Sequence, residues 1–198
     1  MVPVSFFRTL LLGALLAGLG ACGSEPPRRP TYADIRFTDQ APLNLDVQRI
    51  DVVDEYRPVF DPPHFEMRLP VPLPHAADNW ARDRLRAVGS RGTAVAAIID
   101  ATAVEIQLKK QGGLSAMFTT QVDTQYEVRV GIRVEMKDER GLTVRTATGH
   151  AERSMTMLED LSLDERDRML YKMEIELMGE LDRQLETQVR TNFATYVR

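Results

Sequence analysis

Cysteine is nearly absent from this chain, because the only one is at position 22. A lone cysteine cannot form a disulfide within the chain, so the fold must depend on its hydrophobic core. An excess of positive charge is absent too, since the formal net charge is −4 and no basic run occurs. The sequence therefore argues against nucleic-acid binding and against electrostatic docking on anionic lipid.

Motifs for catalysis or cofactor binding are also lacking. No serine has the G-x-S-x-G setting of a nucleophile, and Gly112-Gly113 lacks the lysine and helix of a phosphate-binding loop. The three histidines, His64, His75 and His150, are scattered and lack the spacing of a metal-ligating pair. We therefore predict no catalytic residue, no cofactor and no metal ligand, and we expect surface or structural histidines.

Methionines and acidic residues gather in the carboxyl-terminal half. Five of the nine methionines lie within residues 155–178, where thioethers would suit Cu(I), although methionine also fills the irregular seam between a strand and a helix. Acidic pairs at 159–160 and 164–165 would suit calcium or acid–base catalysis, but a helix amino terminus also favours negative charge. We favour the structural interpretation of both groups.

The amino-terminal segment carries the most informative pattern. Arg8 precedes an apolar run over residues 9–19 that is far shorter than the roughly 20 apolar residues of a membrane-spanning helix. This order is typical of a secretory signal peptide, which is removed from the mature chain. The run ends in Leu19-Gly20-Ala21-Cys22, which resembles the lipobox of bacterial lipoprotein precursors.

The resemblance implies that Cys22 is a site of lipid attachment. In that family the cysteine sulfur receives a diacylglycerol, the signal peptide (here residues 1–21) is removed, and the new amino terminus is usually acylated. Two or three acyl chains hold a protein on a membrane far more firmly than one. The alternatives are an ordinary signal peptide cut beside a cysteine and a short uncleaved anchor.

The residues after Cys22 bear on the membrane that the lipid would enter. Gly23 and Ser24 stand where enteric lipoproteins retained in the inner membrane commonly carry an aspartate. The resemblance therefore favours the outer membrane, with the domain facing the periplasm.

Proline positions indicate how the mature chain is divided. Residues 22–42 contain four prolines and no sustained apolar periodicity, which predicts a lipidated amino terminus followed by a flexible tether. Residues 43–198 are predicted to form a single periplasmic domain. Six more prolines over residues 57–74 predict an extended loop within that domain.

Hydrophobic periodicity predicts an α+β fold. Strands are expected over residues 43–52, with a bulge near 48–49, and over residues 93–108, 122–136 and 142–157. A short helix is expected over 74–88, and a helix of about 35 residues follows Ser162, which forms a capping-box pattern with Glu165. We predict an antiparallel sheet of about four strands, covered on one face by these two helices.

The leading hypothesis is a lipid-anchored, non-enzymatic protein with an accessory, scaffold or binding role. Its layout is similar to that of small Gram-negative lipoproteins accessory to ABC-type transport or outer-membrane assembly. Its expected partners are the membrane, through the lipid on Cys22, and an envelope protein, for which residues 109–118 are a candidate contact. The alternatives are a periplasmic hydrolase with spatially assembled residues and a carrier of an apolar ligand.

Overall fold

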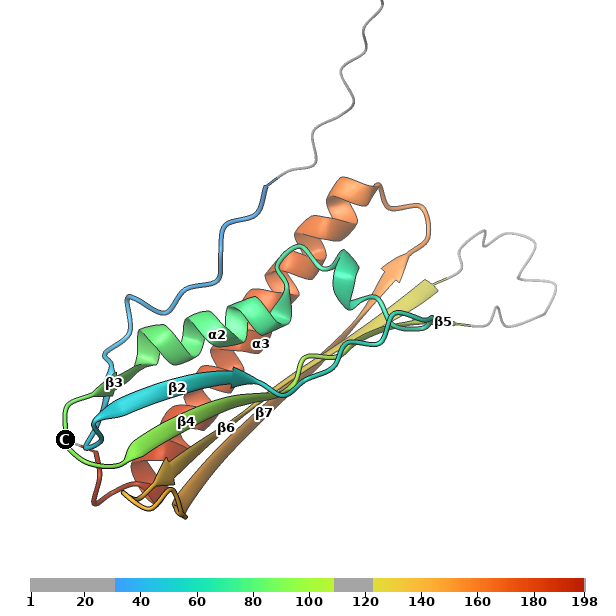
Figure 1. Cartoon of the computed structure of the whole chain (residues 1–198). Helices are drawn as coiled ribbons and strands as arrows, with labels where there is room; N and C mark the ends of the chain where they lie inside the picture. Colours follow the sequence, from blue (N-terminus) through green and yellow to red (C-terminus); the bar gives the residue numbers. More distant parts are fainter. Residues whose placement is uncertain (1–30, 109–122, 198) are drawn as a thin grey trace, which may run out of the picture. The chain divides into compact units, whose positions relative to one another are not determined.

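The structure is a computed structural model, and it describes residues 31–108 and 123–197 (Figure 1). Its main sheet has five strands: β2 (Arg49–Asp54), β4 (Thr93–Asp100), β5 (Ala103–Gln107), β6 (Asp123–Lys137) and β7 (Thr143–Leu158). β7 pairs with one side of β6 along its whole length, while β4 and β5 pair end to end with the other side. β2 lies outside β4.

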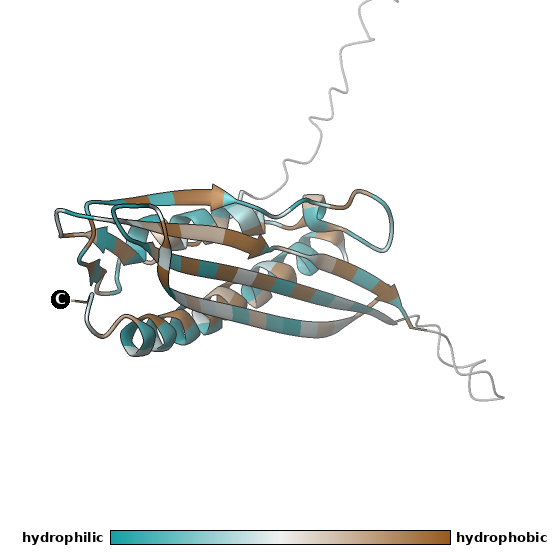
Figure 2. Cartoon of the chain, turned by 60° about the horizontal axis from the view of Figure 1, so that its bottom comes forward, coloured by the Kyte–Doolittle hydropathy of each residue, from teal (hydrophilic) through white to brown (hydrophobic). Residues whose placement is uncertain are grey.

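Two helices cover one face of this sheet and leave the other face open (Figure 2). They are α2 (Leu73–Arg84) and α3 (Leu163–Asn192), and a short 3-10 helix, η2 (Glu66–Arg68), precedes α2. A separate pair of short strands, β1 (Leu43–Leu45) and β3 (Leu85–Ala87), completes the fold. The α+β class and the two helices on one face of a mostly antiparallel sheet agree with the prediction.

The central strand β6 shows why the sheet has one buried face. Every second residue from Tyr126 to Met136 is buried beneath the helices. Between them, Arg129, Arg133 and Glu135 lie on the open face, where Arg133 forms ion pairs with Glu135 and with Glu55. An antiparallel sheet with one solvated face produces this alternation, and it confirms the strand predicted over residues 122–136.

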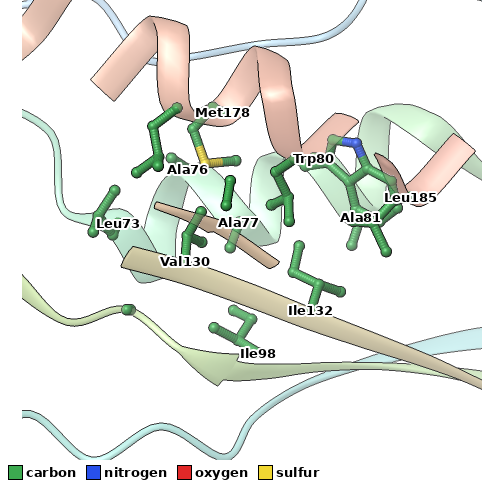
Figure 3. Close-up of a cluster of buried hydrophobic side chains, with 14 of the residues drawn as sticks. Leu73, Ala76, Ala77, Trp80, Ala81, Ile98, Val130, Ile132, Met178 and Leu185 are labelled. Atoms are coloured by element: carbon green, nitrogen blue, oxygen red, sulfur yellow. The ribbon is translucent and has the colours of Figure 1, made fainter. Parts of the chain in front are cut away.

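Helix α2 lies close to the sheet because its inner side chains are small. Ala76, Ala77 and Ala81 are all buried, and they share a cluster with Val130 and Ile132 of β6 (Figure 3). The long helix α3 packs beside α2, over β6 and β7, through larger side chains, among them Met178 and Leu185 (Figure 3). The core therefore fills the layer between the sheet and both helices.

Helix α3 begins as predicted. The Ser162 hydroxyl accepts a hydrogen bond from the Glu165 backbone N–H, and the Glu165 carboxylate accepts one from the Ser162 backbone N–H. This capping box satisfies two donors that the first turn leaves without partners. At about 1.5 Å per residue, the 30 residues of α3 extend about 45 Å.

The strand predicted over residues 43–52 is wrong as a single strand. Residues 43–45 form β1, which pairs with β3, whereas residues 49–54 form β2, which pairs with β4. Both pairs are parallel, because α2 lies in the chain between β1 and β3 as well as between β2 and β4, and a helical crossover joins parallel strands. The predicted helix over 74–88 correspondingly ends at Arg84, before β3.

Residues 31–42 pack on the domain, although the sequence predicts a tether through residue 42. Ile35 and Phe37 are buried. The Arg36 guanidinium donates to the Asp83 carboxylate of α2, and the Tyr171 hydroxyl of α3 donates to the Ala33 carbonyl at 3.0 Å. Cys22, the earlier part of the tether and the candidate contact at 109–118 lie outside the described residues.

Candidate functional site

The three histidines lie apart. The His64 Nδ1 atom is 2.8 Å from a Glu66 carboxylate oxygen, and the His75 Nε2 atom is 3.4 Å from Asp34 at the surface. His150 is exposed on the open face of the sheet. In residues 31–108 and 123–197, no group of His, Cys, Asp or Glu side chains is arranged to hold a metal ion.

The contact between His64 and Glu66 secures the proline-rich loop. One oxygen of the buried Glu66 carboxylate accepts hydrogen bonds from the Tyr56 hydroxyl, from His64 Nδ1 and from the Ala103 backbone N–H. Burial opposes ionisation of Glu66, but these hydrogen bonds outweigh it and lower its pKa. Burial is also the main cause that raises the pKa of Tyr56 to about 12. The cluster holds the loop against β5 and has a structural role.

His150 lies across a glycine of the neighbouring strand. A Cβ atom placed on Gly131 would be 2.6 Å from His150 Nδ1, so the ring occupies the space that a side chain would fill. Across the described part of the chain, no carboxylate or hydroxyl hydrogen-bonds to this ring. The assembly of histidine, acid and hydroxyl that a hydrolase of the serine type needs is therefore not formed around His150.

The sequence analysis assigned the methionines to a strand–helix seam and the acidic pairs to a helix amino terminus. Met157 of β7 and Met173 of α3 are buried in the core, and Met155 and Met169 pack against it. The acidic residues of the α3 first turn include Glu165, which belongs to the capping box. Core packing therefore accounts for these methionines, and the first turn of α3 accounts for the acidic pair at 164–165, whereas the pair at 159–160 lies in the turn before the helix.

A buried charged network joins the two helices, and the sequence analysis missed it. Arg84 of α2 is only 1% exposed, and its guanidinium contacts Asp182 at 2.6 Å and Glu186 at 2.5 Å on α3. The Trp80 indole N–H also donates to Asp182, at 2.8 Å. Charges buried this far from solvent need partners. The signals in the sequence were an arginine four residues after Trp80 on the buried side of α2 and two acidic residues at i, i+4, Asp182 and Glu186, on α3.

The accessible candidate site lies at the end of the domain where α3 finishes. Two adjoining hollows of about 510 and 340 Å³ share Ser90–Gly92 of the loop after β3 and residues 137–139 at the β6–β7 hairpin. Thr195 and Tyr196, after α3, line the smaller hollow. We call these two hollows the distal recess.

Glycine shapes the distal recess. Gly92 has a φ of 71°, and a Cβ atom there would lie 2.7 Å from the Lys137 carbonyl oxygen. Only glycine suits this left-handed conformation beside a neighbouring backbone without strain. The loop after β3 therefore lies directly against the end of β6.

The distal recess has charges of both signs around a small apolar area. Arg49 pairs with Asp51 at 3.1 Å, and Arg91 lies 3.6 Å from Glu139. Val47, Met136, Val144 and Tyr196 add apolar surface to the smaller hollow. Paired charges around an apolar centre are typical of protein–protein contacts, whereas an apolar ligand would need an enclosed apolar cavity.

A third hollow, of about 620 Å³, runs between the edge of β7 and α3. Side chains of α3 close part of this edge: Gln184 accepts a hydrogen bond from the His150 backbone N–H, and Asn192 donates one to the Thr146 carbonyl. These contacts occupy groups that another strand would need for pairing. The distal recess is therefore the better candidate for a binding site.

The distal recess is far from the place where the described chain enters the domain. The Tyr32 ring lies 4.8 Å from the Tyr171 ring, near the start of α3. From Tyr171 to Asn192, α3 advances by about 32 Å at 1.5 Å per residue. Chain entry and distal recess thus mark the two ends of the domain (Figure 1).

Comparisons with known proteins give little. No family model matches the chain, and no curated protein matches it in sequence. A solved structure of a minor lipoprotein from Acinetobacter baumannii aligns at a TM-score of 0.37 and 10% identity, over 71% of this chain and 93% of that one.

A second solved structure, a homolog of neuraminyllactose-binding hemagglutinin from Helicobacter pylori, aligns at a TM-score of 0.30 and 8% identity. That alignment covers 83% of this chain and 98% of that chain. At such scores neither similarity supports an argument about this protein.

None of the helices in the described residues combines the length and the apolar composition of a membrane span.

Proposed function

We propose that this protein is a lipid-anchored envelope lipoprotein with a non-enzymatic accessory or binding role in transport or outer-membrane assembly. The lipid on Cys22 holds it in the membrane, with the outer membrane favoured, and the domain faces the periplasm. The distal recess receives a polar segment of an envelope protein partner. The observation that carries this proposal is that the described chain enters beside Tyr171 while the distal recess lies past Asn192, two points of α3 that are about 32 Å apart along the helix.

The separation matters because an anchored domain has one end near the lipid. A site at the opposite end can reach a partner that projects into the periplasm. The mixed charges of the distal recess favour a polypeptide over a lipid or another apolar ligand. A binding role fits this lining better than a carrier role.

The anchor is tested on protein extracted from bacterial membranes. The intact mass of its amino-terminal peptide should show that residues 1–21 are missing and that Cys22 carries lipid. The Cys22→Ala variant should keep its signal peptide or leave the membrane fraction. An unmodified Cys22 in membrane-extracted protein would contradict the anchor.

The recess is tested by site-specific photocrosslinking in living cells. A photoreactive residue replaces Arg91 or Glu139 in the distal recess, and a matched control replaces the exposed Thr187 on α3. We expect one protein to be crosslinked from both recess positions and not from position 187. The same adduct from all three positions, or none from the recess, would contradict the proposed site.

A further inference from the structure

Three of the four most exposed large apolar side chains in the described part of the chain lie at one end of the domain. In the described part of the chain the four most exposed are Met67 at 74%, Phe60 at 72%, Leu163 at 68% and Leu142 at 61%. Leu142 belongs to the hairpin after β6, beside the distal recess. The other three come from the proline-rich loop, η2 and the start of α3.

Contacts place these three at the end where the chain enters. His64 forms an antiparallel bridge with Val104, and the Glu105 N–H donates to the Pro63 carbonyl, so the proline-rich loop follows β5 toward its carboxyl-terminal end. Phe60 directly precedes the turn at residues 61–64 that begins this contact. The carboxyl-terminal end of β5 pairs with the beginning of β6. On its other side, the beginning of β6 pairs with the end of β7, and α3 follows β7 in the chain. Figure 1 shows this loop and the start of α3 at the end away from the C label.

The exposure is built into the fold. The loop that carries Phe60 and Met67 is held by the three hydrogen bonds to Glu66 and by two backbone bonds to β5, from Phe65 to Ala103 and from Glu105 to Pro63. Arg68, next to Met67, pairs with Glu105 at 2.9 Å. These contacts fix the backbone on both sides of Met67, whose side chain is 74% exposed and stays in water unless a partner covers it.

Chain length limits how far this end can lie from the lipid. Tyr32, which contacts Tyr171 near the start of α3, is ten positions after Cys22 in the chain. A chain of ten residues spans at most about 35 Å, even when fully extended. The end with the exposed apolar side chains is therefore the one that an acylated Cys22 would keep beside the membrane.

We propose that Phe60, Met67 and Leu163 insert into the interface of the bilayer that holds the Cys22 lipid, so that the domain rests on the membrane by its entry end. This inference rests on the proposed lipid anchor. Asp164 and Glu165 follow Leu163 directly and would repel anionic lipid. Apolar contact therefore drives the insertion, and neutral lipid suffices.

The test uses the lipidated protein in neutral phosphatidylcholine vesicles. Since the lipid occupies Cys22, a new cysteine is the only free thiol for a fluorescent label. We compare Phe60→Cys and Leu163→Cys with Leu142→Cys, since Leu142 is a mostly exposed leucine at the other end. Spin-labelled lipid should quench the labels at 60 and 163 at least about threefold more than the label at 142, because interfacial side chains enter only the outer part of the bilayer.

Two outcomes would overturn the inference. Equal quenching at positions 60, 163 and 142 in protein that floats with the vesicles overturns the membrane contact and leaves the anchor intact. A wild-type chain that takes up the label and fails to float overturns the anchor, and the contact with it.

A second variant adds Phe60→Ser and Leu163→Ser to a Met67→Cys reporter. Quenching of the label at position 67 should fall at least about twofold, because apolar insertion is lost.

Discussion

At the scale of single residues, two glycines in neighbouring strands provide a matched test of packing. A Cβ atom on Gly149 would lie 2.6 Å from the Leu185 side chain, which is fully buried on α3. On Gly131 the nearest group is the exposed His150 ring, which can rotate away. Gly149→Ala should therefore lower the free energy of unfolding by about 1 to 3 kcal/mol.

Gly131→Ala serves as the comparison and should cost less than about 1 kcal/mol. Denaturant titration of both variants measures the difference. If both variants lose the same free energy of unfolding, the Leu185 side chain on α3 makes room for a methyl group as easily as the exposed His150 ring does.

The buried Glu174 of α3 makes stability depend on pH. Burial is the main cause that raises its pKa from 4.5 to about 8, while a hydrogen bond from the Val71 backbone N–H opposes the shift. Between these values the unfolded chain loses a proton that the folded chain keeps, so stability falls as pH rises from about 4.5 to about 8.

Glu174→Gln removes this titration, because an amide stays neutral at every pH. The variant should be more stable than wild type by about 1 to 3 kcal/mol at pH 8 and close to it at pH 4.5. Thermal unfolding at both pH values measures the effect. A variant that follows the wild-type pH profile would show that another group carries the dependence.

Residue-scale features divide into those visible in the sequence and those created by packing. The capping pair Ser162 and Glu165 is local, so it could be predicted from four consecutive positions. Glu66, with donors from Tyr56, His64 and Ala103, depends on a loop closing onto a strand 37 residues later. The distal recess likewise combines segments that only the folded chain brings together, so no spacing of residues within one segment predicts it.

At the scale of elements, the network between α2 and α3 should be sensitive to the loss of any one member, because the charge left behind stays buried without its partner. Asp182→Ala leaves Arg84 buried with only Glu186 as an acidic partner and removes the acceptor of Trp80. Loss of one partner from a buried ion pair costs about 3 to 5 kcal/mol. Calorimetric melting of the variant measures this loss.

The exposed pair Arg82 and Asp78, on the outer side of α2, is the natural control. Arg82→Ala should change stability by less than about 1 kcal/mol, because solvent screens such pairs. If the two alanine variants melt alike, the buried network contributes no more than a surface pair.

Periodicity identified the long elements because each buries one face along its whole length. β6 and α3 have 15 and 30 residues, over which alternation and a helical stripe are unmistakable. The division of residues 43–54 between two sheets was missed, since three-residue β1 is too short to show a period. The parallel pairing of β2 with β4 follows from the α2 crossover and could have been expected from the order of elements.

At the scale of the whole molecule, the domain extends further toward the amino terminus than its prolines suggest. Ile35 and Phe37 are buried in the core, and residues 31–198 form one compact unit. A chain that begins at Thr31 should therefore melt at the same temperature as one that begins at Cys22.

A chain that begins at Leu43 loses both apolar side chains from the core. Its free energy of unfolding should fall by about 3 to 6 kcal/mol, from about 1.5 to 3 kcal/mol for each buried side chain. The three lengths are compared by thermal melting. Unchanged stability in the shortest chain would show that residues 31–42 contribute nothing to the core.

The amide side chains that α3 extends to β7 have a consequence for crowding. Proteins confined to a surface meet one another far more often than in free solution, and long strand edges are where copies would fuse into continuous sheets. Gln184 and Asn192 engage the outward N–H of His150 and the outward carbonyl of Thr146 on this edge. Helix α3 thus also occupies part of the β7 edge, so that a strand of another molecule cannot pair there without first displacing these two side chains.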